Sequence, residues 1–308
     1  MPPEKVILIG PTTFGMTDAA ALTQLEEAGY RVRRNPVGRK MSQEELLSAL
    51  TGVVGAIAGL ELYSAEVLAR SQLKVVSRCG VGLGNIDLPK AREMGIRVYS
   101  TPDAPTTAVA ELTVGALITL LRKVPQMDRG MHDGKWEKRS GPQLEGKTIT
   151  LIGLGRIGRK VAEYLRPFGV RLLGVDPALQ GTVEGIPIVS LGQALAESDI
   201  VSIHASGTAE ILGAEELAAA KPGVYVTNAG RGGLINERAL CDALDSGKVA
   251  GAWLDAFSEE PYDGPLTSYS QVLLTPHVGY SSDEARRRME REAANNLLAG
   301  LADTESVR

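Results

Sequence analysis

The amino-acid sequence predicts an α/β protein of two domains, and two patterns carry this prediction. Short apolar runs rich in β-branched residues recur along the 308 residues, and amphipathic stretches of helical period separate them. Runs that are apolar on both faces suit parallel strands covered by helices on each side. With 44% hydrophobic and 23% charged residues, the chain is large enough to bury the cores of two globular domains.

Taken in order, the apolar runs predict eight strands. They cover residues 5–10, 53–58, 73–78, 148–153, 170–176, 199–204, 223–228 and 249–255. Amphipathic patterns predict helices at 17–29, 158–169 and 236–248, and each ends at or beside a glycine, as helix C-termini often do. A further helix, at 282–301, begins with many charges and must pack its apolar face on the first domain or on the connection between domains.

One helical stretch, residues 103–136, is about twice the usual length and has a proline near its middle. We interpret it as two consecutive helices that connect one α/β unit to the next and expose an apolar surface. A core helix buried within a monomer is the alternative. The exposed surface would need a partner, which predicts a homodimer.

Charge and cysteine usage exclude several classes of protein. The net charge of −4, from 33 basic and 37 acidic residues, leaves no basic stripe for nucleic acid, and the basic segment 31–35 suits a solvated strand edge. The apolar run near the N-terminus is too short for a signal peptide or a membrane span, so we expect a cytoplasmic protein without a membrane partner. Cys79 and Cys241 lie far apart and predict neither a disulfide nor a metal site.

A glycine-rich motif follows the predicted strand 148–153 and opens the next helix. Gly153, Gly155 and Gly158 form the pattern G-x-G-x-x-G. In this context the glycines allow a tight turn, the approach of a pyrophosphate and close packing of helix on strand, while the helix N-terminus faces the phosphates. Asp176 ends the following strand, where a carboxylate accepts hydrogen bonds from ribose hydroxyls and repels a 2′-phosphate. The motif therefore predicts NAD rather than NADP.

Three further residues have an ordinary structural interpretation when each is taken singly. Arg231, between glycines, could be a solvated surface turn, Glu260 part of an acidic loop, and His277 a hydrogen-bonded structural histidine. Beside a dinucleotide site, the three together supply what oxidation of an alcohol requires. These requirements are a base for the hydroxyl proton, a carboxylate to orient that base, and a cation for an anionic substrate and its carbonyl.

Six motifs in order resemble the D-isomer-specific 2-hydroxyacid dehydrogenase family, particularly its phosphoglycerate dehydrogenase-like members. They are "SRCGVGLGNIDLPKAREMGI", "TPDAPTTAVAEL", "LIGLGRIG", "NAGRGGLIN", "LDAFSEEP" and "TPHVG", and they cover nearly the whole chain. The resemblance implies two Rossmann-like domains with doubly wound parallel sheets and an active site in the cleft between them. A discontinuous substrate domain would comprise 1–101 and 282–308, and an NAD-binding domain would comprise 102–281.

The same resemblance implies an NAD-dependent oxidoreductase that acts on CH–OH groups by hydride transfer between nicotinamide C4 and substrate C2. Arg231 would bind the substrate carboxylate and polarise the carbonyl, and Glu260 would hold His277, the general acid and base. The implied substrate-binding residues are Arg78, Val81, Gly82 and Arg231. The implied cofactor-binding residues are Gly153, Gly155, Arg156, Ile157, Gly158, Asp176, Ala205, Ala229, Asp255 and Gly279, with Asp255 facing the nicotinamide carboxamide. His132 and His204 lie outside these motifs and are interpreted as structural.

The chain departs from the family pattern in places that bear on substrate and cofactor. Gly84 and Gly230 replace the usual aspartate and alanine or serine, and the stretch 204–216 is about three residues short. Phosphoglycerate dehydrogenases carry an arginine near Ala58 or Gly59 for the phosphate, and none is present here. Arg78 matches a second basic residue of that phosphate pocket, whereas Glu61 would repel an anion unless it points away or pairs with a cation.

These departures leave several functions open. A phosphoglycerate dehydrogenase-like enzyme is the first expectation, and a hydroxypyruvate or glyoxylate reductase is the alternative within the family. Oxidation of phosphite or formate on the same framework, and a non-catalytic NAD(H)-sensing protein like the corepressors that share this fold, are further alternatives. The position of the last residue, Arg308, predicts no appended regulatory domain and disfavours the corepressor, whose relatives carry extra unstructured segments.

Overall fold

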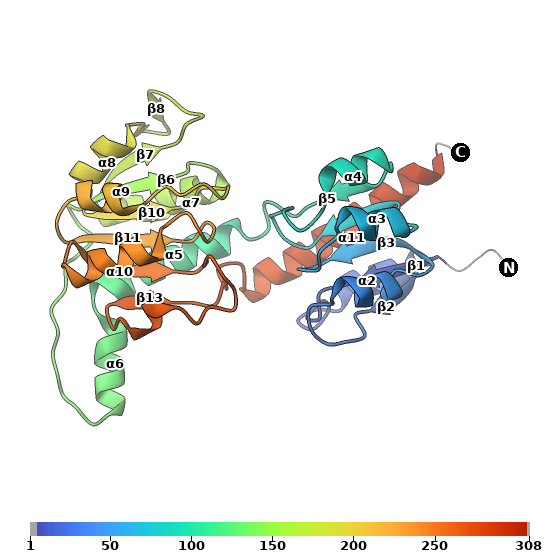
Figure 1. Cartoon of the computed structure of the whole chain (residues 1–308), viewed down its shortest axis with the longest axis horizontal. Coiled ribbons are helices and arrows are strands. Elements are labelled where there is room, and N and C mark those ends of the chain that lie inside the picture. Colours follow the sequence, from blue (N-terminus) through green and yellow to red (C-terminus); the bar gives the residue numbers. More distant parts are fainter. Residues whose placement is uncertain (1–4, 307–308) are drawn as a thin grey trace. The chain divides into compact units, whose positions relative to one another are not determined.

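The computed structural model describes residues 5–306, and the chain divides into two compact units (Figure 1). Unit 1 comprises Met1–Pro105 and Ser281–Arg308, and unit 2 comprises Thr106–Tyr280. Each unit has a parallel sheet with helices on both faces, as the α/β alternation predicts. No helix among the described residues is long and apolar enough to cross a membrane.

Unit 1 is built on a five-stranded parallel sheet with the strand order β2-β1-β3-β4-β5. The strands are β1 (Val6–Ile9), β2 (Arg31–Arg34), β3 (Val53–Ala58), β4 (Val75–Arg78) and β5 (Arg97–Tyr99). The basic segment forms the edge strand β2, which confirms its interpretation as a strand edge. The central strand β3 is almost wholly buried, because both of its faces are covered by helices.

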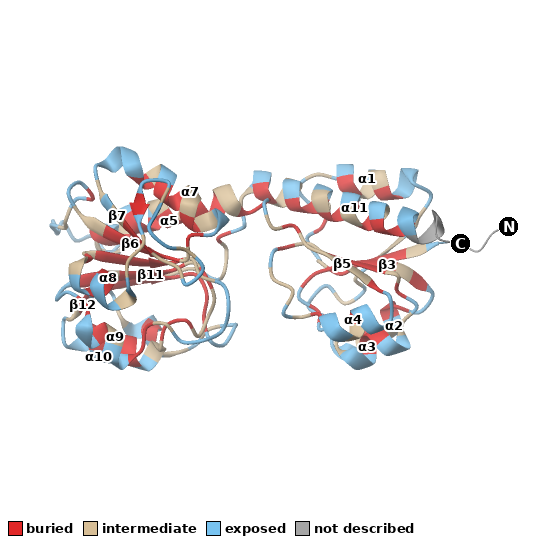
Figure 2. Ribbon diagram, turned by 90° about the horizontal axis from the view of Figure 1, so that it is seen from above, coloured by how far each residue is buried: buried red, intermediate tan, exposed pale blue. Residues whose placement is uncertain are grey.

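The helices of unit 1 cover its sheet on both faces (Figure 2). They are α1 (Ala20–Glu27), α2 (Gln43–Ala49), α3 (Ala65–Arg70), α4 (Leu88–Glu93) and α11 (Asp283–Ser306). Helices α1 and α11 pack on one face, and α2, α3 and α4 pack on the other. The chain therefore leaves β1 and its neighbour β3 toward opposite faces, which makes a topological switch point between their carboxyl ends.

Unit 2 has a six-stranded parallel sheet with the order β13-β12-β11-β10-β6-β7. The strands are β6 (Thr148–Ile152), β7 (Arg171–Val175), β10 (Ile200–Ile203), β11 (Val224–Asn228), β12 (Val249–Leu254) and β13 (Val272–Leu274). A small antiparallel hairpin, β8 (Thr182–Val183) with β9 (Ile186–Pro187), lies outside this sheet. All eight apolar runs predicted as strands form parallel strands. Three of them are β1, β3 and β4 of unit 1, and five are β6, β7, β10, β11 and β12 of unit 2.

Helices also cover both faces of the sheet in unit 2 (Figure 2). They are α5 (Thr106–Leu121), α6 (Val124–His132), α7 (Arg156–Leu165), α8 (Leu191–Glu197), α9 (Ala214–Ala219) and α10 (Glu237–Asp245), with 3₁₀ turns η1 (Arg166–Phe168) and η2 (Pro265–Ser268). Helices α5 and α7 pack together on one face, and α8, α9 and α10 pack on the other. Because α7 follows β6 and α9 follows β10, the switch point of this sheet lies between β6 and β10.

Local sequence explains where many of these helices begin. The side chains of Ser42, Ser64, Asp87, Ser190 and Asn236 each accept a backbone N–H from the first turn of the helix that follows. Such caps satisfy N–H groups that have no partner within the helix. Glycines at 29, 169 and 247 adopt a positive φ just after α1, η1 and α10, as the glycine-closed patterns predict.

The long connection forms two consecutive helices, α5 and α6, as predicted. Eight residues of α5 are buried in the core of unit 2, whereas none of α6 is buried. Helix α6 extends away from the layers of its own unit, and the segment after it returns to β6 (Figure 1). Helix α5 therefore fits the interpretation as a buried core helix, and α6 fits the interpretation as an exposed surface.

Candidate active site

The glycine-rich loop of unit 2 is a tight turn that only glycine can form. Gly153 has φ of 91°, and a Cβ atom there would lie 2.7 Å from the backbone nitrogen of Ala205. A Cβ on Gly158 would lie 2.0 Å from the carbonyl oxygen of Gly153. Both distances are far below a normal carbon contact, so the absence of side chains is what lets β6, α7 and the end of β10 meet.

Gly155 differs from these two glycines because its surroundings are open. It is the N-cap of α7, and a Cβ atom there would meet nothing within 4 Å. Arg156 and Ile157 begin the helix, whose first N–H groups have no partner within it. Open space in front of a helix N-terminus is suited to a phosphate, because backbone N–H groups and the helix dipole both favour negative charge.

Asp176 closes one side of this loop. It follows β7, and its Oδ2 accepts a hydrogen bond of 2.9 Å from the N–H of Leu154, which lies between the first two glycines. Its Oδ1 accepts a hydrogen bond of 3.0 Å from the N–H of Ala178. A carboxylate has about four acceptor positions, so two protein bonds leave capacity for ribose hydroxyls.

His204 lies beneath the glycine loop, and His132 lies on α6. A Cβ on Gly158 would be 3.8 Å from that of His204, whose Nε2 shares a hydrogen bond of 2.9 Å with Ser202. Desolvation of its ring lowers the pKa of His204 to about 4, so the ring is uncharged at neutral pH. His132 is exposed and lies 3.7 Å from Asp128. These contacts agree with a structural interpretation of both residues.

His277 and Glu260 form a close pair. Nδ1 of His277 lies 2.9 Å from both carboxylate oxygens of Glu260, and the N–H of Phe257 donates to Glu260 Oε1 at 3.1 Å. The side chains of the pair are 41% and 40% exposed, so a small molecule can reach them. Because Nδ1 faces the carboxylate, Nε2 is the nitrogen left to exchange a proton with a reactant.

The loop that carries His277 is fastened by the buried carboxylate of Asp255. Oδ1 of Asp255 accepts from Thr275 Oγ1 at 2.6 Å and from the N–H of Val278 at 2.9 Å, and Oδ2 accepts from the N–H of Gly279 at 2.8 Å. Asp255 is only 4% exposed. These bonds fix the loop on both sides of His277, whose φ is +53°, a left-handed conformation that side chains rarely adopt.

Arg231 lies on a loop that packs against the backbone before Glu260. The glycine after it, Gly232, would place a Cβ 1.7 Å from the carbonyl oxygen of Phe257, so the two loops touch through backbone. Asn228 holds the Arg231 loop by donating to the carbonyl oxygen of Arg231 at 2.9 Å. Nη1 of Arg231 donates to Gly230 O at 2.9 Å, which keeps the guanidinium beside its own loop.

Most of the predicted residues of unit 2 therefore lie at the carboxyl ends of its strands. The glycine loop contacts Ala205, and a Cβ on Gly230 would lie 2.7 Å from Ala205 O. Ala229 follows β11 and bonds to the end of β10 through its N–H. Gly279 must be glycine, because a Cβ there would lie 2.9 Å from Asp255 Oδ2.

The other predicted substrate residues belong to unit 1. Arg78 ends β4, and its Nη1 donates to the carbonyl oxygen of Cys79. Val81 and Gly82 follow in the loop before α4, and Val81 is 39% exposed. Cys79 is partly buried and Cys241 is buried, and both are free thiols. Within residues 5–306, no group of three His, Cys, Asp or Glu side chains could hold a metal ion.

Sequence reasoning missed Thr275, a residue that builds the site, and the structural role of Asp255. Thr275 accepts the indole N–H of Trp253 at 3.0 Å and passes a hydrogen bond to Asp255, so it links a buried strand to the His277 loop. Asp255, which is predicted to face the nicotinamide, also holds the His277 loop through both of its oxygens. A carboxylate that ends a buried strand requires nearby donors, but the sequence does not show which loop supplies them.

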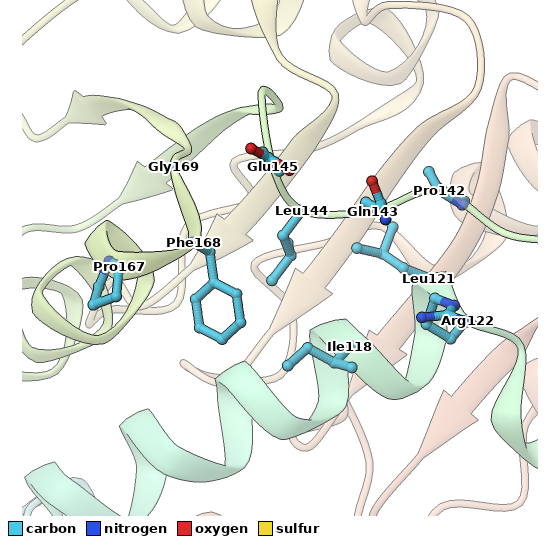
Figure 3. A pocket seen from close by; sticks show the side chains of 10 residues that line it. All are labelled: Ile118, Leu121, Arg122, Pro142, Gln143, Leu144, Glu145, Pro167, Phe168 and Gly169. Atoms are coloured by element: carbon cyan, nitrogen blue, oxygen red, sulfur yellow. The ribbon is translucent and has the colours of Figure 1, made fainter.

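A separate hollow of about 490 Å³ in unit 2 contains none of the predicted site residues (Figure 3). Ile118, Leu144 and Phe168 point into it. Its other lining residues are Leu121, Arg122, Pro142, Gln143, Glu145, Pro167 and Gly169. The hollow is lined by α5, the segment before β6 and the 3₁₀ turn η1, away from the carboxyl ends of the strands.

The sequence was compared with known protein families. Residues 114–279, more than half of the chain, match the model of the D-isomer specific 2-hydroxyacid dehydrogenase NAD-binding domain. The chain belongs to this family. Unit 2 is accordingly its NAD-binding domain, and the resemblance drawn from the six motifs is confirmed.

Other members of the D-2-hydroxyacid dehydrogenase family align with nearly the whole chain. D-3-phosphoglycerate dehydrogenase of Sus scrofa is 37% identical over 92% of this chain and 56% of its own length. Hydroxypyruvate reductase of Thermotoga maritima is 37% identical over 85% of this chain and 89% of its own. The crystal structure of TT0316 protein from Thermus thermophilus has a TM-score of 0.89 and 36% identity, with 97% of each chain covered. The chain spans about half the length of the D-3-phosphoglycerate dehydrogenases it matches.

Two glycine substitutions separate folding of the loop from cofactor binding. Gly155→Ala enters open space, so we expect unchanged thermal stability but NADH binding at least about tenfold weaker, because the methyl group occupies the approach of the pyrophosphate. Gly158→Ala strikes the Gly153 carbonyl and should destabilise the fold by about 1–3 kcal/mol as well. Fluorescence titration with NADH and thermal melts measure both effects. Gly192→Ala, which also enters open space, is the control, and unweakened NADH binding by Gly155→Ala would contradict the assignment.

Proposed function

We propose that the protein is an NAD-dependent dehydrogenase that interconverts small 2-hydroxy and 2-oxo acids. The observation that carries this proposal is the 2.9 Å contact of His277 with Glu260, in the unit that holds the glycine loop. An acid/base group beside a nicotinamide site is what hydride transfer to a carbonyl requires, since the oxygen gains a proton as the carbon gains hydride. Membership of the family supports the same activity.

The proposed mechanism assigns a step to each polar residue. When bound, NADH supplies the hydride. His277 donates the proton from Nε2 to the carbonyl oxygen, and Glu260 stabilises the imidazolium through Nδ1. Arg231 binds the substrate carboxylate and polarises the carbonyl, which the guanidinium suits because it offers several donors in one plane. In the oxidative direction His277 accepts the hydroxyl proton instead.

The proposed substrate is either a phosphorylated acid such as D-3-phosphoglycerate or an unphosphorylated acid such as hydroxypyruvate or glyoxylate. Relatives named D-3-phosphoglycerate dehydrogenase and hydroxypyruvate reductase are equally similar in sequence, so their names do not choose between these groups. The chain has Ala58 and Gly59 where phosphoglycerate dehydrogenases carry a phosphate-binding arginine. This difference favours an unphosphorylated acid such as hydroxypyruvate or glyoxylate over D-3-phosphoglycerate.

A homodimer is the proposed assembly. Helix α6 has no buried residue, and the connection and the segment after it expose Ile118, Val124, Met131 and Trp136, the last at 79%. A projecting helix with large exposed apolar side chains is typical of a surface that a second copy covers. Residues 124–136 also carry both acidic and basic side chains, which suits a surface that pairs with a second copy of itself.

The activity is tested by NADH oxidation with a panel of 2-oxo acids. Turnover of any member supports the enzyme, whereas tight NADH binding without turnover would support the NAD(H)-sensing alternative. His277→Ala should lower kcat at least about a hundredfold with NADH binding intact, because the proton donor is lost. Unchanged kcat would remove His277 from the mechanism.

Glu260→Gln keeps a hydrogen-bond acceptor for His277 but removes the charge that stabilises imidazolium. We therefore expect kcat for reduction at neutral pH to fall at least about tenfold, because the positive charge that His277 carries as proton donor loses its counter-charge. The matched control is Glu259→Gln, which changes the neighbouring exposed carboxylate and should leave kcat unchanged. Equal kcat in the two variants would contradict the role of Glu260.

Asp176 is proposed to select NADH over NADPH by repelling the 2′-phosphate. The KM for NADH should be at least about tenfold lower than for NADPH, and Asp176→Asn should narrow that ratio while keeping an acceptor for Leu154 N–H. Steady-state kinetics with both cofactors measure the ratio, with the exposed Asp242→Asn as control. A lower KM for NADPH in the unmodified protein would refute the assignment.

The dimer predicts a sedimenting mass of twice 32.6 kDa at micromolar concentration. Met131→Asp places a negative charge on the exposed apolar surface. It should weaken dimer association at least about tenfold, because the dimer would bury a carboxylate that has no cationic partner. Met94→Asp, an exposed methionine of unit 1, is the matched control. Sedimentation of the unmodified protein at the mass of one chain would exclude the dimer.

A further inference from the structure

Leu154, between the first two glycines of the loop in unit 2, is held by its side chain and by both of its backbone groups. The side chain is buried over Gly174 of β7, where a Cβ would lie 2.4 Å from Leu154 Cδ1. Its N–H donates to Asp176 Oδ2 at 2.9 Å. Its carbonyl oxygen accepts a hydrogen bond of 2.8 Å from Nε of Arg159, on α7. Contacts on separate elements therefore set the position of this residue.

Arg159 binds two successive carbonyl groups of the loop. Its backbone N–H donates to the carbonyl oxygen of Gly155 at 3.0 Å, as part of the first turn of α7. Its side chain binds the carbonyl oxygen of Leu154, which precedes the N-cap of the helix. Formation of the helix does not require this second bond. The bond instead determines how the peptide group between Leu154 and Gly155 is turned.

The orientation of that peptide group also directs the N–H of Gly155. The peptide is trans, and a planar trans peptide points its N–H away from its carbonyl oxygen. With the oxygen held by Arg159 on one side, the N–H of Gly155 faces the other. Within residues 5–306 this N–H donates to no protein group, and the surroundings of Gly155 are open. It is therefore available to an anion in front of α7.

The small hairpin β8–β9 holds the outer end of Arg159. Nη1 of Arg159 donates to Glu184 Oε1 at 2.8 Å. Glu184 and Gly185 form the two-residue turn of the hairpin, and both have positive φ, of 50° and 78°, as tight hairpin turns require. The chain after the hairpin is tied to β7, because the N–H of Val189 donates to Gly174 O at 2.9 Å.

The pair of Arg159 with Glu184 directs a side chain more than it stabilises the fold. The two side chains are 40% and 50% exposed, and ion pairs so exposed to water contribute little to stability. The carboxylate also balances the charge of the guanidinium. What Arg159 offers to the glycine loop is therefore a fixed N–H donor at Nε.

We propose that Arg159 is a positioning residue for the cofactor, which orients the Leu154–Gly155 peptide through Nε. In this orientation Leu154 N–H holds Asp176 for the ribose, and Gly155 N–H meets the pyrophosphate. The inference rests on the cofactor site of the proposed function and gives the β8–β9 hairpin a part in it. A loop that is oriented before the cofactor arrives binds it with a smaller loss of entropy.

Two substitutions at Arg159 separate the donor atom from the charge. Nε2 of glutamine is attached to Cδ, as Nε of arginine is, so Arg159→Gln keeps a donor near that position without the charge. Arg159→Met keeps the length but has no donor. We expect NADH binding at least about tenfold weaker in Arg159→Met and within about threefold of the unmodified protein in Arg159→Gln. Fluorescence titration with NADH measures both affinities.

The control for these variants is Arg171→Met, which removes an exposed ion pair of 2.7 Å with Glu197 in the same unit. It should leave NADH binding unchanged. Equal affinities in Arg159→Met and Arg171→Met would overturn the inference. Equal losses in Arg159→Met and Arg159→Gln would also overturn it, because charge rather than the Nε donor would then matter.

The effect should be confined to the phosphate half of the cofactor. ADP, which has the ribose and pyrophosphate but no nicotinamide, should lose affinity for Arg159→Met by about the same factor as NADH. At saturating NADH, kcat and the KM for the 2-oxo acid should stay within about twofold, because Arg159 touches no reacting group. A general distortion of the unit would change these constants too, and unchanged ADP binding would contradict the proposed role.

Glu184→Gln tests the hairpin without changing the loop, and it decides if thermal melts show that Arg159→Met is unfolded. We expect NADH binding about two- to fivefold weaker, because Nη1 loses its charged acceptor and Nε is held less firmly. Glu163→Gln, which removes an exposed ion pair with Lys160 on α7, is the matched control. Equal affinities in these two variants would overturn the part assigned to the hairpin.

Failure of this inference differs from failure of the proposed function. If no 2-oxo acid is reduced, the proposed activity fails, whereas the titrations with NADH and ADP still decide the role of Arg159. If the unmodified protein binds neither NADH nor ADP, both fail together.

Discussion

The geometry of the site depends on one buried carboxylate, that of Asp255. A residue other than glycine in the left-handed conformation costs about 1–2 kcal/mol, and His277 adopts it with φ of +53°. Each hydrogen bond to a charged acceptor contributes about 1.5–3 kcal/mol. Asp255 makes three such bonds to the loop around His277, so their sum exceeds the strain. The direction in which His277 meets Glu260 is therefore set by a residue that touches neither ring nor carboxylate.

The sheets of both units have a switch point, but the groups that line the two switch points differ in charge. Each sheet has a switch point, and each switch point is lined by glycines at which a Cβ would clash. In unit 2 the space before Gly155 stays open and the N–H groups of α7 favour an anion. In unit 1 the corresponding space is filled by the carboxylate of Glu61, which accepts the N–H of Gly59 at 2.9 Å. The switch point of unit 2 therefore presents backbone N–H groups, whereas that of unit 1 is occupied by a side chain.

The sequence was sufficient for features that short spacing determines. Apolar runs predicted eight of the sheet strands but not β5 or β13, which are only three residues long. The glycine motif predicted the turn between β6 and α7, and the basic segment predicted an edge strand. The pairing of His277 with Glu260 came from the family pattern and is present at 2.9 Å. The partners of Asp255 and the burial of Glu61 were not predictable, because they depend on contacts between separate loops. An acidic residue between two leucines in a surface loop would ordinarily face solvent.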